Sequence, residues 1–214
     1  MQQRICEAAE RQARSAAQSG DAYQELLADG ARYASKKDWR RAARACREAI
    51  ALNPDEPTAY HNLGGMLANS AHYVEAAQRF LEAKERHPVP SGPWGRATAK
   101  AFNMLQQEVC AEVAKPKWWN DEGLKALSAR VVRVAPDYGH ANQMRAFVLS
   151  GRVSAFGRRL LSGPRSLAEL REAAAHYERT AALHPAPAMK AELTSRAERC
   201  RAAVRLRSMG INIV

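Results

Sequence analysis

The sequence predicts an all-α fold: an α-solenoid of helix-turn-helix repeats with a capping helix at its C-terminal end. Pro54 and Pro88 lie 34 residues apart, and small residues recur at the same offsets before each of them. A period of this length is typical of repeats made of two helices. Ala and Arg, which both favour helices, are abundant, whereas aromatic residues make up only 7% of the chain. Periodicity and composition therefore indicate the same helical class.

Local sequence signals indicate where the first five helices begin and end. Asp21 and Asp38 stand where N-caps are needed, just before runs with helical periodicity. Pro54 and Pro88 each end the second helix of a pair, because proline cannot continue the helical hydrogen bonds. The sequence thus predicts a leading helix over 3–18 and two pairs over 22–35, 38–52, 57–69 and 73–86.

Gly30 and Gly64 occupy equivalent positions in the middle of the first helix of each pair. Glycine inside a helix costs about 1 kcal/mol relative to alanine. We expect the partner helix to cross at these points and to leave no room for a side chain. Small residues of the second helices serve the same close approach: Ala42, Ala49, Ala76 and Ala83.

The regular period breaks after Pro88. A stiff turn at 90–93 precedes a helix that we predict over about 95–114. The next helix opens at Trp118-Trp119-Asn120-Asp121, with an Asn or Asp cap, and runs to about 134 before Pro136. The longer step from Pro88 to Pro136 indicates a third unit with an insertion of roughly 14 residues.

A fourth, divergent unit begins with a helix over 138–150. Its second helix comes late, after the loop 151–165, and opens at Ser166, which forms a capping box with Glu169. A last helix over 187–208 is rich in Arg and Glu and reads as the polar cap that the open end of a solenoid requires.

The second unit resembles the tetratricopeptide repeat at every signature position: Tyr60, Leu63, Gly64, Leu67, Ala76, Phe80, Ala83 and Pro88. The first unit matches at Gly30, Tyr33, Ala42, Ala49 and Pro54, and departs at Asp29 and Cys46. The resemblance covers 23–185 and is strongest over 23–88. It implies a right-handed solenoid divided into an N-terminal helix (1–20), two regular repeats (21–56, 57–90), a divergent unit with an insertion (91–137), a divergent unit with an Arg-rich loop (138–185), and a capping helix with an apolar tail (186–214).

The resemblance also implies a role in binding other proteins. Tetratricopeptide proteins act as scaffolds and adaptors, and hold extended peptides or helices in a groove lined by the first helix of each repeat. We therefore expect a subunit of a larger assembly or an adaptor that binds acidic or extended segments. The expected groove residues are Gln24, Leu27, Ala31, His61, Asn62, Gly65, Asn69, Arg96, Lys100 and Asn103.

A chaperone co-factor is one alternative. Some tetratricopeptide domains grip a C-terminal carboxylate with a clamp of Lys, Asn and Arg side chains. Asn62 and Arg96 match two clamp positions, but Leu27, Ala31 and Gly92 occupy the other three. The clamp is therefore not favoured.

A basic protein bound to nucleic acid, for example in a ribonucleoprotein particle, is a second alternative. The formal net charge is +11, and a cluster of cations lies at Lys36, Lys37, Arg40, Arg41, Arg44 and Arg47. Arg40, Arg44 and Arg47 share one helix face, and phosphate contacts need such clusters. A solvated face and a general bias toward Arg are the competing interpretations.

The loop 151–165 mixes Arg with apolar residues, a composition that anchors protein interfaces. Its candidate docking residues are Arg152, Phe156, Arg158, Arg159 and Leu160. A packed structural insertion is the alternative. Trp118-Trp119 has two interpretations as well, a ligand-stacking pair or a filler at the start of a helix.

The remaining signals are negative. The chain lacks GxSxG, HExxH and P-loop motifs, so we expect no enzyme and no cofactor. The four cysteines lack metal-ligand spacing, and Cys46 falls on a core position of the first repeat. No apolar stretch has the length of a membrane span, and the N-terminus lacks a secretory signal. We expect a cytoplasmic protein and leave an organelle open.

Overall fold

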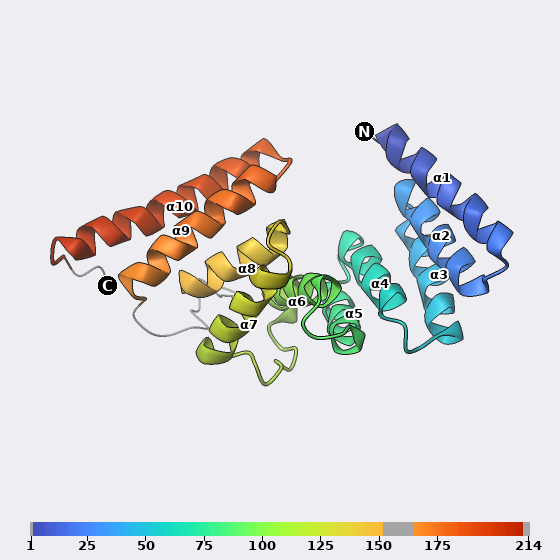
Figure 1. The fold of residues 1–214 in the computed structure, drawn as a ribbon, viewed down its shortest axis with the longest axis horizontal. Coiled ribbons are helices and arrows are strands. Elements are labelled where there is room, and N and C mark those ends of the chain that lie inside the picture. The colour runs from blue at the N-terminus through green and yellow to red at the C-terminus, as the bar shows by residue number, and fades with distance from the viewer. Residues whose placement is uncertain (1, 152–164, 212–214) are drawn as a thin grey trace. The chain divides into compact units, whose positions relative to one another are not determined.

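The computed structural model describes residues 2–151 and 165–211, and these residues form ten α-helices and one 3₁₀ turn with no strand (Figure 1). Helices that follow one another in the chain pack side by side within each of two compact units, residues 1–89 and 90–214. This consecutive packing is consistent with a helical repeat. The all-α prediction is confirmed for the described residues.

The first unit contains five helices: α1 (Gln2–Ser19), α2 (Ala22–Ser35), α3 (Trp39–Leu52), α4 (Pro57–Asn69) and α5 (Tyr73–Arg86). The two expected N-caps are present. The Asp21 carboxylate accepts hydrogen bonds from the backbone N–H groups of Tyr23 and Gln24, and Asp38 accepts one from that of Arg41. The predicted bounds agree within one residue because these caps and the prolines act locally.

The turns of the two hairpins have the same backbone conformation 34 residues apart. Lys37 (φ 60°) and Ala71 (φ 63°) both adopt the left-handed region, which side chains disfavour. In the first turn the Tyr33 carbonyl accepts from the N–H groups of Lys36 and Asp38; in the second the Leu67 carbonyl accepts from those of Ser70 and His72. The sequence period thus has a direct counterpart in backbone geometry.

The two helix glycines are positions of close approach, as predicted. A Cβ on Gly30 would lie 3.3 Å from Cys46 Sγ, and one on Gly64 would lie 3.0 Å from the Phe80 ring. Cys46 and Phe80 are themselves 34 residues apart and almost fully buried. The alanines of the second helices are buried completely: Ala42, Ala49, Ala76 and Ala83.

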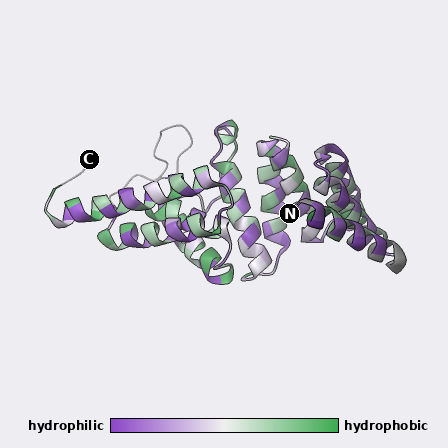
Figure 2. Ribbon diagram, turned by 90° about the horizontal axis from the view of Figure 1, so that it is seen from above, coloured by the Kyte–Doolittle hydropathy of each residue, from purple (hydrophilic) through white to green (hydrophobic). Residues whose placement is uncertain are grey.

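The second unit contains α6 (Gly92–Leu105), the 3₁₀ turn (Glu108–Cys110), α7 (Asp121–Val134), α8 (Gly139–Leu149), α9 (Leu167–Leu183) and α10 (Pro187–Ser208). One apolar cluster joins α6, α7 and α8 around Phe102, Leu124 and Met144. A second joins α8, α9 and α10 around Tyr177 and Leu193. The helices alternate between hydrophobic and hydrophilic residues along their length, as amphipathic helices do (Figure 2).

The capping box before α9 is present, since Ser166 and Glu169 exchange hydrogen bonds between side chain and backbone. On α10, Leu193, Ala197 and Cys200 are buried against α9, and most of the remaining residues are exposed. This one-sided burial agrees with a terminal helix that faces solvent. Among the residues that the structure describes, no helix combines the length and the apolar composition needed to cross a membrane.

The helix predicted over 95–114 is wrong at both ends. It begins earlier, at Gly92, because the Ser91 hydroxyl accepts a hydrogen bond from the Trp94 N–H at 3.2 Å and Pro93 fits a first turn. It ends earlier, at Leu105. The Lys115 ammonium folds back and donates to the carbonyl oxygens of Leu105 (3.3 Å) and Cys110, which stabilises an irregular segment instead of a continued helix.

The two tryptophans pack at the start of α7. The Trp119 ring lies 5.3 Å from that of Phe102, between centroids, and Trp118 lies 5.6 Å from Trp119. Both are half-buried against the cluster of α6, α7 and α8. A Cβ on Gly123 would lie 2.7 Å from the Trp118 carbonyl oxygen. The absence of a side chain at Gly123 therefore lets the backbone at Trp118 pass close to α7. The packing supports the interpretation of the pair as a filler.

Candidate functional site

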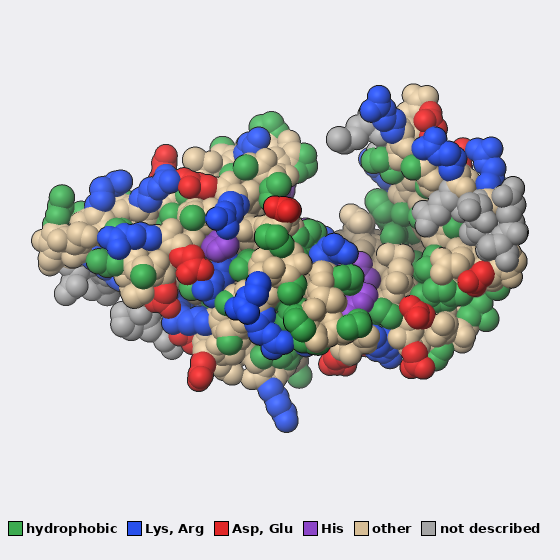
Figure 3. All heavy atoms as spheres, in the orientation of Figure 1, with side chains coloured by type: hydrophobic (Ala, Val, Ile, Leu, Met, Phe, Trp, Pro, Cys, Tyr) green, Lys and Arg blue, Asp and Glu red, His purple; other side chains and the backbone are tan. Residues whose placement is uncertain are grey.

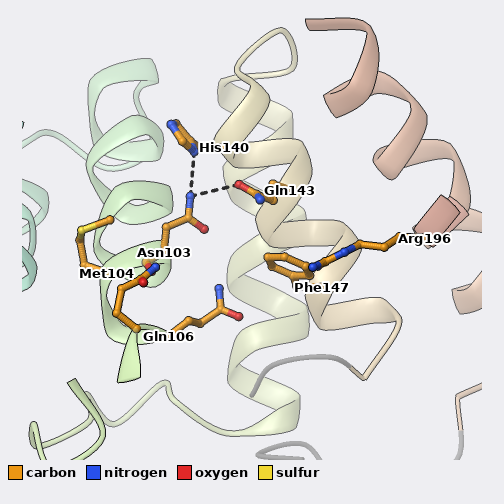
Figure 4. Close-up of a pocket in the computed structure, with 8 residues that line it drawn as sticks. Asn103, Met104, Gln106, His140, Gln143, Phe147 and Arg196 are labelled. Carbon is orange, nitrogen blue, oxygen red and sulfur yellow. Dashed lines mark hydrogen bonds between the residues drawn. The ribbon is translucent and has the colours of Figure 1, made fainter. Parts of the chain in front are cut away.

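The second unit contains a pocket of about 450 Å³ between helices α6, α8 and α10 (Figure 4). It lies within the range of volumes found for ligand sites. The lining side chains are amides, an imidazole, a thioether, an aromatic ring and a guanidinium: Asn103, Met104, Gln106, Gln107, His140, Gln143, Phe147 and Arg196. Of the expected groove residues, Asn103 lies in this pocket and Lys100 lies one turn before it on α6.

Asn103 is the central polar residue of the pocket. Its side chain points from α6 toward α8, where Nδ2 donates to His140 Nδ1 at 2.8 Å and, at 3.5 Å, to Gln143 Oε1 (Figure 4). Only 9% of the residue is exposed. The other amide atom, Oδ1, is buried without a hydrogen-bond partner in the described part of the chain. An unsatisfied buried acceptor costs about 1–3 kcal/mol, so this oxygen requires an explanation.

His140 holds the Asn103 amide in place. Burial, followed by the nearby charge of Lys100, lowers the pKa of His140 to about 4. The ring is therefore neutral at pH 7. Because Nδ1 accepts from Asn103, the ring proton is on Nε2. The Tyr138 ring meets the His140 ring edge to face at 5.3 Å, which fixes its orientation.

Lys100, one turn before Asn103 on α6, brings a positive charge close enough to His140 to affect its pKa. Burial lowers its pKa, and no other cause contributes to the shift. Within the described residues its ammonium has no carboxylate within 4 Å and no hydrogen bond. Arg96, one turn earlier on α6, is exposed. The α6 face thus carries two cations that lack acidic partners among those residues.

Arg196 and Phe147 form the opposite wall. The Arg196 guanidinium stacks over the Phe147 ring, with Cζ 5.0 Å from the ring centroid, and pairs with Glu192 on its own helix. Its Nε is buried and, among the residues described, has no hydrogen-bond partner. The pocket therefore presents one unsatisfied acceptor and one unsatisfied donor.

The other expected groove residues lie on α2 and α4 of the first unit. The His61 ring packs edge-on against Phe80 at 5.3 Å, and the Asn69 amide donates to the Gly65 carbonyl of its own helix at 2.9 Å. Gln24 is exposed and Asn62 is half-buried. Their presence in a groove stays a prediction.

The cationic cluster is exposed but largely paired. All six of its side chains reach solvent. Four form ion pairs within their own unit: Lys36 with Glu10 (4.0 Å), Arg41 with Asp38 (3.5 Å), Arg44 with Glu48 (2.8 Å) and Arg47 with Glu75 (3.1 Å). In the described residues Lys37 and Arg40 have no acidic partner. On the face seen in Figure 3, Lys and Arg are spread over the surface and not gathered in one place.

The candidate docking residues of the long loop, Arg152 to Leu160, lie outside the described residues. Arg165, at the end of the loop, is only 6% exposed. It pairs with Asp121 at the start of α7 at 2.7 Å, and Arg207 donates to its carbonyl oxygen. Lys125 bridges Asp121 and Glu169 in the same cluster. This ion-pair cluster, which the sequence did not predict, anchors the loop end between α7, α9 and α10.

In the part of the chain that the structure describes, no group of three His, Cys, Asp or Glu side chains is placed to hold a metal ion. Burial raises the pKa of Cys46 to about 11, so this thiol stays protonated at pH 7. A protonated thiol is a weak nucleophile, which fits the expected core role of Cys46.

The pocket residues on α8 and α10 were not predicted from the sequence. His140, Gln143 and Phe147 follow the i, i+3, i+7 pattern of a single helix face, which places them together on α8 but does not indicate what that face meets. Arg196 carries no comparable signal, because its place depends on how α10 packs. Comparison with models of known protein families found no match for the chain, and neither did comparison with curated proteins.

Proposed function

We propose that the chain is a non-catalytic scaffold of the tetratricopeptide type, an adaptor or a structural subunit that binds segments of other proteins. The observation that carries this proposal is the pocket between α6, α8 and α10. It offers peptide-like hydrogen-bonding groups, with one unpaired acceptor on α6 and one unpaired donor on α10. Such a site suits an extended chain better than it suits chemistry.

The repeat character of the first unit supports the family assignment. The two hairpin turns have the same pattern of backbone hydrogen bonds, 34 residues apart. The first helix of each hairpin also has a glycine that packs against the partner helix, at the same spacing. A right-handed solenoid with these repeats would set its first helices side by side along one face. We infer that α6, α8 and α10 line part of such a face.

The alternatives have weaker support. Four of the six clustered cations already pair with carboxylates, which leaves less charge for nucleic acid. Leu27, at the first clamp position of a chaperone co-factor, is buried in the core.

The test is affinity capture by the immobilised full chain from lysate of its native cells, with nuclease treatment. We expect retained proteins that survive nuclease treatment and moderate salt. A chain that retains no protein would contradict the scaffold function. Retention that disappears with nuclease, or binding to RNA or DNA that weakens steeply with salt, would favour the nucleic-acid alternative.

A further inference from the structure

We propose that the pocket of the second unit binds an acidic residue inside a peptide chain. The backbone N–H of this residue donates to Asn103 Oδ1, and its side-chain carboxylate is bound by Lys100. The inference rests on the proposed function, since it specifies which feature of a bound segment the scaffold recognises.

The Asn103 amide is held in one orientation, and its oxygen lacks a donor. The side chain is held by its nitrogen, which donates to His140 and Gln143 on α8. With the ring proton of His140 on Nε2, turning the amide would point its oxygen at two acceptors, His140 Nδ1 and Gln143 Oε1, and both bonds would be lost. Oδ1 is buried, faces the pocket and has no donor among the described residues. A ligand N–H supplies that donor, and backbone N–H groups must be paired when buried.

The charge of Lys100 has no acidic partner among the described residues. This ammonium is partly buried and has no carboxylate within 4 Å in the part of the chain that is described. A ligand carboxylate would offset its burial. Lys100 and Asn103 are three positions apart on α6, so their Cβ atoms are separated by roughly 5–6 Å. One acidic residue spans this separation, from its backbone N–H to its side-chain carboxylate.

The residues around Asn103 indicate that the bound acidic residue lies inside a peptide chain and not at its end. Along the chain, Asn103 lies between Lys100, one turn earlier on α6, and Gln106 and Gln107, which line the pocket about one turn later. A bound chain can therefore continue past Asn103 in both directions. Toward α10, Arg196 Nε is an unpaired donor that can bind a carbonyl oxygen of the same chain. The groups match an extended backbone with one acidic side chain.

The experiment is an NMR titration of the isotope-labelled full chain with four short peptides of glycine and serine. The first is acetylated and amidated and carries a central glutamate. The second has glutamine in its place, and the third has N-methylglutamate. The fourth has the glutamine and a free C-terminal carboxylate. The resonances followed are the Asn103 side-chain amide, the His140 ring and the Lys100 ammonium.

We expect the glutamate peptide to shift these resonances and to bind about tenfold or more tightly than the other three, because it alone makes both contacts. Lys100→Gln should abolish the preference for glutamate over glutamine. Asn103→Ala should abolish the preference over N-methylglutamate. Lys117→Gln, which removes an exposed cation of the same unit, should change neither preference. The unchanged spectrum of the remaining residues checks that each variant is folded.

Equal affinity for glutamate and glutamine, or no shift at Asn103, would overturn the proposal. Tighter binding of the peptide with the free C-terminus would overturn the placement inside the chain. These outcomes are separate from the scaffold function. If Lys100→Gln retains the same captured proteins as the wild type, the scaffold stands and this subsite fails. If nothing is captured but the glutamate preference is observed, the subsite stands and the scaffold fails.

Discussion

The Asn103 side chain is held in place by hydrogen bonds from its amide nitrogen, while its amide oxygen lacks a hydrogen-bond donor among the described residues. The two acceptors of the nitrogen both lie on α8. The geometry requires a neutral His140, because a protonated ring would present a second donor to an amide nitrogen that is itself a donor. The pocket therefore depends on the ionisation state of one buried imidazole.

We predict that His140 stays neutral in the folded chain down to about pH 4. In the unfolded chain an ordinary histidine has a pKa of about 6.5. Between these values the unfolded state binds the extra proton, so folding stability falls as the pH drops from about 6.5 toward 4. NMR titration of the ring measures this directly. A ring that titrates near pH 6.5 would contradict the buried contact. His140→Gln should reduce the pH dependence of unfolding, and the part that remains includes His176, whose pKa is also lowered by burial.

Ala71 is a second residue with a measurable signature. It adopts φ 63°, where a side chain costs about 1–2 kcal/mol and glycine does not. We predict that Ala71→Gly stabilises the chain by up to about 1 kcal/mol, despite the greater freedom of glycine in the unfolded chain. Urea unfolding measures the change. Ala68→Gly, inside α4, is the control and should destabilise by about 1 kcal/mol; equal losses in both variants would refute the turn geometry.

Among the elements, the α4–α5 hairpin depends on the contact between one glycine and one ring. A Cβ on Gly64 would meet the Phe80 ring at 3.0 Å, whereas one on Gly65 would have no atom within 4 Å. The two adjacent positions therefore separate helix propensity from packing. Gly64 is needed for the close approach of α5, and Gly65 is not.

We predict opposite effects of alanine at these positions. Gly64→Ala should destabilise by about 1–3 kcal/mol, because overpacking displaces the Phe80 ring or the helix. Gly65→Ala should stabilise by up to about 1 kcal/mol through helix propensity alone. The free energy of unfolding in urea gives both values. A stabilising Gly64→Ala would show that the helices are farther apart than described.

Helix bounds could be predicted wherever a local signal exists. Asp21, Asp38 and the capping box at Ser166 act on the next three residues, and a proline ends the helix that it follows. The end of α6 at Leu105 has no such signal. It depends on Lys115, ten residues later, whose ammonium reaches the Leu105 carbonyl oxygen. A contact between distant residues could not be read from the local pattern, and the helix was predicted too long.

In the molecule as a whole, regular and irregular parts differ in how far the sequence reveals their function. The 34-residue period led to α6 and to Lys100 and Asn103 as groove residues. It could not lead to His140 or Arg196, because insertions separate α6 from α8 and α8 from α10. Which α8 face meets Asn103 depends on packing across these insertions. The pocket thus lies in the unit where the period fails.

We propose that the chain works by binding protein segments through the pocket between α6, α8 and α10. The most direct test of this proposal compares proteins captured from native lysate, by quantitative mass spectrometry, for three chains: wild type, Lys100→Gln/Asn103→Ala, and Arg40→Gln/Arg44→Gln/Arg47→Gln. Circular dichroism confirms that the variants are folded. We predict that the pocket variant loses most captured protein and that the variant of the cationic cluster keeps it. Full retention by the pocket variant, with loss in the variant of the cationic cluster, would contradict the account.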